Sequence, residues 1–308
     1  MVLEQPSLKA PPVRVGGIDY LNALPLTRYL RTSGEPRLDV SEHAPSVLAS
    51  SLRAGELDVA LAPVVEYLAR EEYTVVPGLC ISSYGAVESI RFYARREPSK
   101  VRVVAVDTSS RSSVLLLRLL YRELWRGRPR FVPAAPERLL RVLGASSTSS
   151  TSPDAPDAPD AQDAQDGAGP DAVLVIGDAA LRSSAGPGWE LLDLGTEWTR
   201  WTGLPFVYAF WIWRGGPAPG GLVRRFQEAR DVGLARVDDI VAGVSLPEEG
   251  PFTSADCRDY LRRSIQYDLG PRQIEGLELF FSLLERNGLT AARPRAISYV
   301  DANDDTGG

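Results

Sequence analysis

The sequence predicts an α/β protein of two lobes, with a discontinuous first lobe and a cleft between the lobes. Short apolar runs alternate with helical patterns along most of the chain, which is typical of parallel or mixed sheets covered on both faces. Helical segments occur at both ends, with a strand-rich block between them. The 308 residues, 44% of them hydrophobic, are enough for two lobes of medium size. We expect lobe one at 12–93 and 206–300, and lobe two at 94–205.

The first half of the chain supplies most of the expected strands. In order, we expect a strand at 13–18, a helix from about Asn22 to Arg31, a helix at 45–58, a buried strand at 59–63, a short helix at 64–70, strands at 73–83, 89–95 and 101–107, and a strongly apolar helix at 113–126. The chain would leave lobe one near 89–98, so that the first connection across the cleft lies there.

The second half repeats the pattern and ends in helices. A strand is expected at 130–134, a strand–helix pair at 171–181 and a further strand at 206–214, where the chain would return to lobe one. The last helix, at 271–289, begins with Pro271 in its first turn and stops at Gly288. Its apolar stripe consists of Ile274, Leu277, Phe281 and Leu284.

One segment, 146–170, differs from the rest in composition. It is a Ser/Thr tract followed by repeated Pro-Asp-Ala and Gln-Asp-Ala triplets, without apolar periodicity. Such a segment cannot bury enough surface to offset its ordering entropy, so we expect a disordered loop insertion. An acidic interaction tail is the alternative. Five of the six net negative charges come from its aspartates, Asp154, Asp157, Asp160, Asp163 and Asp166.

Composition excludes several classes of function. A formal charge of −6 and a pI near 5.1 argue against nucleic-acid binding. Lys9 and Lys100 are the only lysines, which leaves little room for Schiff-base chemistry. His43 is the single histidine, in an expected surface loop, so a His-based triad or a multi-His metal site is disfavoured. Cys80 and Cys257 lie too far apart in sequence to signal a zinc site or a disulfide framework.

The sequence carries no recognisable cofactor motif or membrane segment. It contains no phosphate-binding Walker loop, dinucleotide fingerprint, zinc-protease motif or calcium loop, so we expect neither a cofactor nor a metal. The first residues lack a basic stretch followed by an apolar one, and the aromatic-rich run at 203–213 is too short to span a bilayer. We therefore expect a cytoplasmic protein that does not contact membranes; its oligomeric state is not predicted.

The turn after the first strand carries the first candidate residue, Asn22. In open α/β sheets, ligands bind beyond the carboxyl ends of strands, where loops lead into helix N-termini. Asn22 follows the strand at 13–18 and stands where the next helix is expected to begin. It can therefore face a ligand, or it can simply cap the helix, because Asn is among the best N-cap residues.

A second turn, after the strand at 101–107, is rich in hydroxyl groups. These side chains precede a long helix, whose free N–H groups and positive dipole end favour an anion. Redundant N-capping is the alternative interpretation. The candidate ligand-binding residues of this turn are Thr108, Ser109, Ser110, Arg111, Ser112 and Ser113.

Three further turns add candidates. Asp178 follows the strand of the 171–181 pair and is more typical of a helix cap than of a catalyst. Ser83, Gly85 and Ser89 lie beside the first expected crossover, and Phe206 lies beside the second. Aromatic residues at such a position are more often part of the packing between lobes than of a substrate site.

Taken together, four stretches carry a resemblance to a known family. "DYLNALPL", "ISSYGAVESIRFY", "VDTSSRSSVLLLRLL" and "EWTRWTGLPFVYAFW" occur in this order. The chain resembles, from about Val13 to Gly288 and except for the insert, the menaquinone-biosynthesis family of chorismate dehydratases, which act in the futalosine route. The resemblance implies the fold of type II periplasmic binding proteins, with two α/β lobes around a cleft.

The resemblance also implies an activity and a set of residues. The family removes water from chorismate to give 3-[(1-carboxyvinyl)oxy]benzoate, which needs neither a metal nor an organic cofactor. By the resemblance, Asn22 and Ser89 match polar pocket residues that matter for turnover, and Ser109 to Ser113 match a carboxylate-binding turn. The group that accepts the proton is left open, with the enolpyruvyl carboxylate of the substrate as the hypothesis.

Two alternatives share this fold. One is a cytoplasmic solute-binding protein without catalysis, which the missing signal peptide disfavours. The other is the sister enzyme of the same route, 1,4-dihydroxy-6-naphthoate synthase, which by resemblance depends on a histidine. The expected surface position of His43 disfavours that enzyme.

Overall fold

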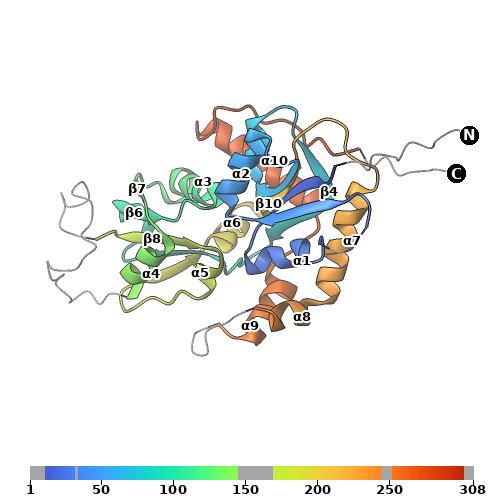
Figure 1. Ribbon diagram of the computed structural model, residues 1–308. Coiled ribbons are helices and arrows are strands. Elements are labelled where there is room, and N and C mark those ends of the chain that lie inside the picture. The colour runs from blue at the N-terminus through green and yellow to red at the C-terminus, as the bar shows by residue number, and fades with distance from the viewer. Residues whose placement is uncertain (1–10, 32–33, 145–168, 245–251, 302–308) are drawn as a thin grey trace, which may run out of the picture.

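Two mixed β-sheets organise the protein, one in each lobe. The computed structural model describes residues 11–31, 34–144, 169–244 and 252–301. Each sheet has five strands with helices packed around it, and the two groups lie next to each other (Figure 1). The α/β fold with two lobes that the alternating pattern predicts is confirmed.

The first sheet combines strands from distant parts of the chain. In spatial order its strands are β2 (Leu38–Glu42), β1 (Val13–Gly17), β3 (Val59–Pro63), β10 (Phe206–Trp213) and β4 (Thr74–Ser83). β1 is parallel to both of its neighbours, whereas β10 runs antiparallel between β3 and β4. Every residue of β10 is buried, as expected for a strand whose two faces are both covered.

The helices of this lobe come from the beginning and the end of the chain. They are the 3₁₀ turn η1 (Leu21–Ala23), α1 (Leu24–Thr27), α2 (Pro45–Ala54), the 3₁₀ helix η2 (Val64–Ala69), α7 (Leu222–Ala235), α8 (Val237–Ala242), α9 (Ser254–Asp259), the π-helical turn η6 (Tyr260–Ser264) and α10 (Pro271–Arg286). As predicted, Pro271 opens α10, and Gly288 follows its end with a φ of +62°.

The prediction of a single helix from Asn22 to Arg31 is wrong. The chain forms one 3₁₀ turn and then the four-residue α1 instead. Pro25 is the second residue of α1 and has no N–H, so it cannot continue a helix from the preceding residues. Asn22 therefore lies in the 3₁₀ turn, before the proline.

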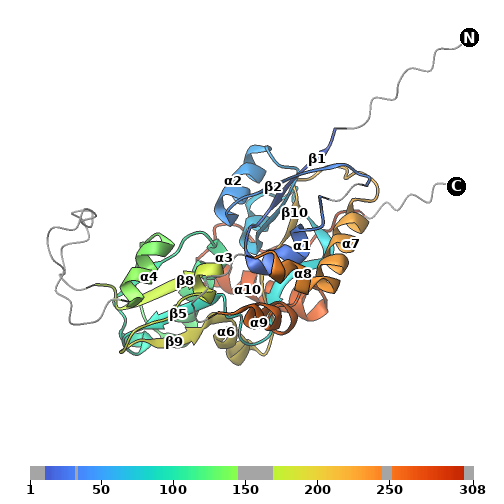
Figure 2. The same cartoon turned by 60° about the horizontal axis from the view of Figure 1, so that its bottom comes forward.

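The second sheet is built from one continuous stretch of chain. In spatial order its strands are β7 (Arg130–Pro133), β6 (Val103–Val106), β8 (Ala172–Ile176), β5 (Ile90–Ala94) and β9 (Glu190–Asp193). Its main helices are α3 (Arg111–Leu120), which a π-helical turn over Tyr121–Trp125 extends, α4 (Pro136–Gly144), α5 (Gly177–Leu181) and α6 (Leu194–Thr202). Figure 2 shows α4, β5, β8 and β9 together at one end of the molecule.

One strand, β5, belongs to the second sheet, although the expected lobe boundaries place most of it in lobe one. β5 pairs with β8 and β9, so the chain changes sheets between Ser83 and Ile90 rather than at 93–94. The chain returns to the first sheet with β10, which begins at Phe206. The insert expected to be disordered, 146–170, falls outside the described residues except for its last two positions.

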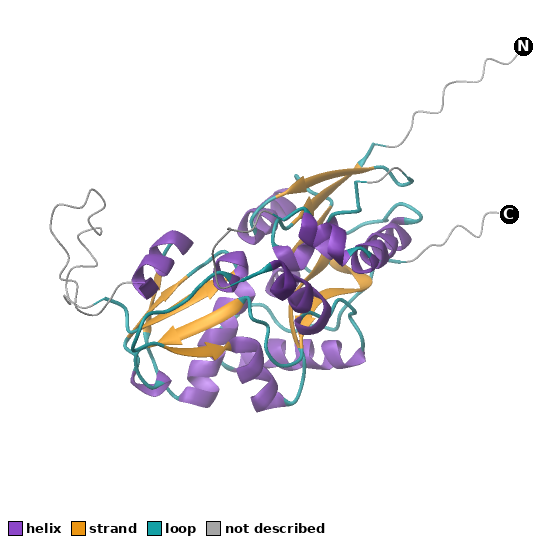
Figure 3. Cartoon of the chain, turned by 90° about the horizontal axis from the view of Figure 1, so that it is seen from below, coloured by secondary structure: helices purple, strands orange, loops and turns teal. Residues whose placement is uncertain are grey.

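The two lobes are joined by a shared apolar core. One cluster of buried side chains includes residues from both sheets. At the junction, the ring of Phe206 packs against Trp198 and Phe280 at centroid distances of 5.2 and 4.8 Å. The strands of the two lobes nevertheless form separate groups when seen from below (Figure 3). Within the described ranges, no helix is both long and apolar enough to cross a membrane.

Candidate active site

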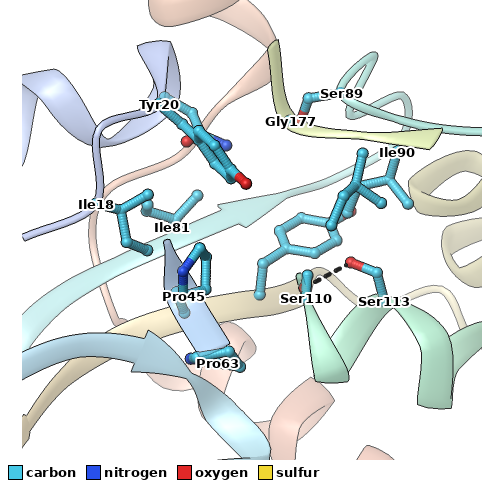
Figure 4. Close-up of a pocket in the computed structure, with 14 residues that line it drawn as sticks. Ile18, Tyr20, Pro45, Pro63, Ile81, Ser89, Ile90, Ser110, Ser113 and Gly177 are labelled. Atoms are coloured by element: carbon cyan, nitrogen blue, oxygen red, sulfur yellow. Dashed lines mark hydrogen bonds between the residues drawn. The ribbon is translucent and has the colours of Figure 1, made fainter. Parts of the chain in front are cut away.

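A pocket lies between the lobes, where strands of both sheets end. It encloses about 480 Å³ of space, counting its open mouth. Strand ends and helix starts supply its walls, which is the usual ligand position in open α/β sheets. The lining residues are Ile18, Tyr20, Asn22, Pro45, Pro63, Ile81, Ser89, Ile90, Ser110, Ser113, Ile176, Gly177, Tyr208 and Ala209, most of which are labelled in Figure 4.

Asn22 lines this pocket from the first lobe. It is the middle residue of η1 and is half-buried. The N-cap of α1 is Ala23, and no side chain caps that helix. The interpretation of Asn22 as a helix cap is therefore wrong. The buried hydroxyl of Tyr260 lies beside Asn22 and Ser89, and burial raises the pKa of Tyr260, so this hydroxyl stays neutral.

Ser89 lines the pocket from the loop that connects the two sheets. It is almost completely buried. Its carbonyl accepts a hydrogen bond from Gly177 N at 2.8 Å. The carboxylate of Asp193 accepts bonds from the backbone N–H groups of Val87 (3.0 and 3.1 Å) and Glu88 (2.7 Å). Because Glu88 has a φ of +61°, these bonds hold an otherwise unfavourable turn in place and so fix Ser89.

The hydroxyl-rich turn places Ser110 and Ser113 in the pocket at the start of α3. Their hydroxyls lie 3.0 Å apart (Figure 4). Ser110 is the N-cap residue, but no side chain caps the helix, so redundant capping does not explain this turn. The first N–H groups of the ten-residue α3 and two hydroxyls thus meet at one side of the pocket, an arrangement that suits an anion.

The other candidates of this turn lie around the pocket without lining it. Thr108 is exposed, and Ser112 is buried with an unpartnered hydroxyl. The backbone N–H of Ser109 donates to Asp107 Oδ1 at 2.8 Å. The exposed guanidinium of Arg111 pairs with the buried carboxylate of Glu66 at 3.4 Å, across the two lobes.

Three further candidates do not line the pocket but contact residues around it: Ser83, Gly85 and Phe206. The Oγ of Ser83 lies 2.9 Å from the hydroxyl of Tyr208, which does line the pocket. Gly85 N donates to Thr199 Oγ1 at 2.9 Å. The ring of Phe206 packs against that of Tyr208 at 4.9 Å, within the aromatic junction of the lobes; Phe206 is almost completely buried there and does not line the pocket.

Asp178 also caps no helix. The N-cap of α5 is Ile176, without a side-chain hydrogen bond, so the cap interpretation is wrong. Instead, Asp178 Oδ1 accepts a bond from the backbone N–H of Leu21, in the other lobe, at 3.0 Å. Burial raises the pKa of Asp178, while the Leu21 N–H and Arg182 oppose that shift.

The pocket is lined by neutral groups. The side chains that line it within the described part of the chain include no Asp, Glu, Arg, Lys or His. Its polar groups are one amide, three serine hydroxyls and two phenols, those of Tyr20 and Tyr208. Burial raises the pKa of Tyr208 well above its usual value, so this phenol remains a neutral hydrogen-bond donor. His43 is exposed beyond β2 and does not line the pocket.

Most of the apolar wall is not predicted by the sequence patterns. Four isoleucines of this wall lie near strand ends: Ile18, Ile81, Ile90 and Ile176. A position near a strand end favours a place in the wall, but it does not say which of the adjacent side chains faces the pocket. Tyr208 lies in β10, whose residues are all buried. Because apolar and polar residues do not alternate along such a strand, the sequence does not indicate which of its side chains faces the pocket. Tyr20 lies two residues before Asn22 on the expected ligand-binding turn, so the same criterion predicts it.

Comparisons with known proteins agree with this architecture. A family model described as menaquinone biosynthesis matches residues 13–148 and 137–286. A curated Thermus thermophilus protein named chorismate dehydratase is 29% identical over 247 residues, covering 74% of this chain and 80% of its own.

Solved structures show the fold alone. A protein of Archaeoglobus fulgidus aligns with a TM-score of 0.65 and 14% identity, over 91% of this chain and 98% of its own. The periplasmic aliphatic sulphonate-binding protein of Escherichia coli aligns with a TM-score of 0.56 and 14% identity, over 95% of this chain and 94% of its own. A Candida albicans protein described as having the generic periplasmic-binding-protein fold aligns at 0.55 and 11%, over 96% and 99%. The chain thus has the periplasmic-binding-protein fold.

Proposed function

Because the chain belongs to the menaquinone biosynthesis family, we propose that it is a chorismate dehydratase. It would eliminate water from chorismate to give 3-[(1-carboxyvinyl)oxy]benzoate, as a carbon–oxygen lyase. The observation that carries this proposal is the likeness to a protein named chorismate dehydratase along 247 residues. The pocket between the lobes, lined by neutral donors, supports it.

The chemistry fits a site of this composition. One ring C–H bond breaks, and its electrons delocalise into the ring carboxylate. The neighbouring C–O bond to the hydroxyl then breaks, and the proton and hydroxide leave as water while the ring becomes aromatic. Nothing is oxidised or reduced. The protein has to hold a flexible dianion and to place donors where negative charge builds.

The pocket residues divide these tasks. The start of α3, with Ser110 and Ser113, would hold one carboxylate of the substrate. Asn22 and Ser89 would donate to the part of the substrate where charge develops. The isoleucines of the wall would contact the ring. Because the described lining residues include no carboxylate, lysine or histidine, we assign the proton to the enolpyruvyl carboxylate of the substrate itself.

Two alternatives remain testable beside this function. The fold likeness to a sulphonate-binding protein favours a solute-binding protein as the second candidate. The sister synthase of the same route would need a histidine, and the exposed position of His43 disfavours it.

Mass analysis after mixing the purified protein with chorismate tests the proposal. We expect a product lighter than chorismate by one water and aromatic in its ultraviolet absorption. The Asn22→Asp variant serves as the matched control, because it retains the size of the side chain but should convert chorismate far more slowly. A wild-type protein that binds chorismate and leaves it unchanged is a solute-binding protein, and this result would overturn the proposal.

A further inference from the structure

The turn that carries Asn22 belongs to the first lobe, yet residues of the second lobe hold it. The backbone N–H of Leu21 donates to Asp178 Oδ1 at 3.0 Å. The hydroxyl of the preceding residue, Tyr20, lies 3.4 Å from Ser109 Oγ. Asp178 and Ser109 follow two neighbouring strands of the second sheet, β8 and β6. Two hydrogen bonds thus cross the cleft to Tyr20 and Leu21, the two residues before Asn22.

A steric contact accompanies these two bonds. Gly177 has a φ of +65°, and a Cβ built on it would lie only 3.0 Å from Tyr20 Cε2. The ring of Tyr20 therefore packs directly on the backbone of Gly177, in the wall that also contains Ser89 (Figure 4). Only glycine leaves room for this ring in that backbone conformation.

The carboxylate of Asp178 has no evident task within its own lobe. It caps no helix, and α5 is only five residues long. Among the described residues, its carboxylate accepts a hydrogen bond from the backbone N–H of Leu21, in the other lobe. Asp178 is half-buried, and a hydrogen bond from a backbone N–H to a carboxylate is stronger than a neutral one. The bond is thus well suited to fix the position of η1.

We propose that Asp178 is a positioning residue, which holds the Asn22 turn across the cleft so that Asn22 reaches the substrate only when the lobes are closed. Lobe closure and the placement of Asn22 are then a single event. The assignment to catalysis rests on the proposed function, whereas the contact between Asp178 and Leu21 can be tested without it.

Three variants separate the hydrogen bond from other effects. Asp178→Asn keeps an oxygen that can accept the Leu21 N–H, and Asp178→Ala removes it. Asp178→Leu also lacks an acceptor but keeps a side chain branched at Cγ, which provides a second variant should the alanine variant fold poorly. Arg111→Ala is the matched control, because it removes a different contact across the lobes, the pair with Glu66.

Hydrogen exchange of the Leu21 amide is the first readout, and it does not depend on activity. We expect faster exchange in Asp178→Ala and Asp178→Leu, and wild-type exchange in Asp178→Asn and Arg111→Ala. Unchanged exchange in the alanine and leucine variants would overturn the proposal. Equal acceleration in Arg111→Ala would also overturn it, because the effect would then be a general loosening of the lobes.

Steady-state kinetics with chorismate is the second readout. We expect kcat to fall about 10- to 100-fold in Asp178→Ala, with a smaller change in KM, because the start of α3 still holds the substrate. Asp178→Asn should stay within about fivefold of wild type. A loss in KM alone would contradict a positioning role. If the wild type does not convert chorismate, the proposed function fails, while the exchange experiment still decides whether Asp178 holds the turn.

Discussion

Replacing Gly177 with alanine should destabilise the protein more than replacing an equivalent glycine elsewhere. An L-residue at a φ of +65° costs about 1 kcal/mol in backbone strain. The new Cβ would also lie 3.0 Å from Tyr20 Cε2 and 3.2 Å from Cδ2 and Cζ, and such overpacking adds about 1–3 kcal/mol. We therefore expect Gly177→Ala to lower the free energy of unfolding by about 2–4 kcal/mol.

Gly203 provides the matched control for the backbone term. Its φ is +70°, and a Cβ there would meet nothing within 4 Å. Gly203→Ala should therefore cost only about 1 kcal/mol. The excess in Gly177→Ala measures the contact with Tyr20, so it should disappear in a Tyr20→Ala background.

Urea unfolding followed by circular dichroism provides the assay. The wild type, Gly177→Ala, Gly203→Ala, Tyr20→Ala and the double variant Gly177→Ala/Tyr20→Ala are compared at one temperature. Activity adds a second test, since a displaced Tyr20 ring would disturb the neighbouring Asn22 and reduce kcat. If Gly177→Ala lowers the free energy of unfolding no more than Gly203→Ala does, or if the excess persists in the Tyr20→Ala background, the contact with Tyr20 is not its cause.

Four further outcomes are expected. Asn22→Asp should lower kcat/KM more than about tenfold, because two charges ~4 Å apart repel by roughly 4 kcal/mol at an effective dielectric of 20; activity within about threefold of wild type would speak against contact with the substrate. Ser89→Ala removes one neutral donor and should cost about 1–2 kcal/mol in kcat/KM, less than Asn22→Asp. Burial raises the pKa of Glu66, and nearby arginines oppose this shift. Because the folded state then binds a proton that the unfolded state releases, the stability of the wild type relative to Glu66→Gln should fall as the pH rises from the ordinary to the raised pKa. Urea unfolding over this pH range measures the difference. Burial raises the pKa of Cys80 to about 12, so this thiol should react with a thiol reagent at pH 8 only after unfolding.

Local patterns predicted the fold well because each strand carries its own signal. The buried runs at 59–63 and 206–213 are apolar on both faces, and both are inner strands of the first sheet. β2 was missed because an edge strand with partly exposed side chains carries little hydrophobic signal. The short α1 was overestimated because apolar spacing extends past Pro25, whereas hydrogen bonding does not.

The candidate site was predictable to the extent that it follows strand ends. That rule predicts Asn22, Ser110 and Ser113, whereas Ser89 is a candidate through its place beside the first crossover; all four line the pocket. The rule cannot say which neighbour of a strand end points inward, so Ser109 and Ser112 were included with the same weight. It also cannot detect a bond such as that of Asp178 with Leu21, whose partners lie 157 residues apart in sequence and in different lobes.

The position of β10 has a consequence for protein synthesis. The strands of the second sheet all lie between Ile90 and Asp193, so the ribosome delivers that sheet whole before β10 appears. The first sheet cannot be completed at that stage, because β10, which ends at Trp213, lies between β3 and β4 and pairs with both. Until then β4, ten residues long, has unpaired edges that can bind other chains. Nascent chains in which β10 has not yet left the ribosome should therefore depend on chaperones more than chains in which β10 has emerged.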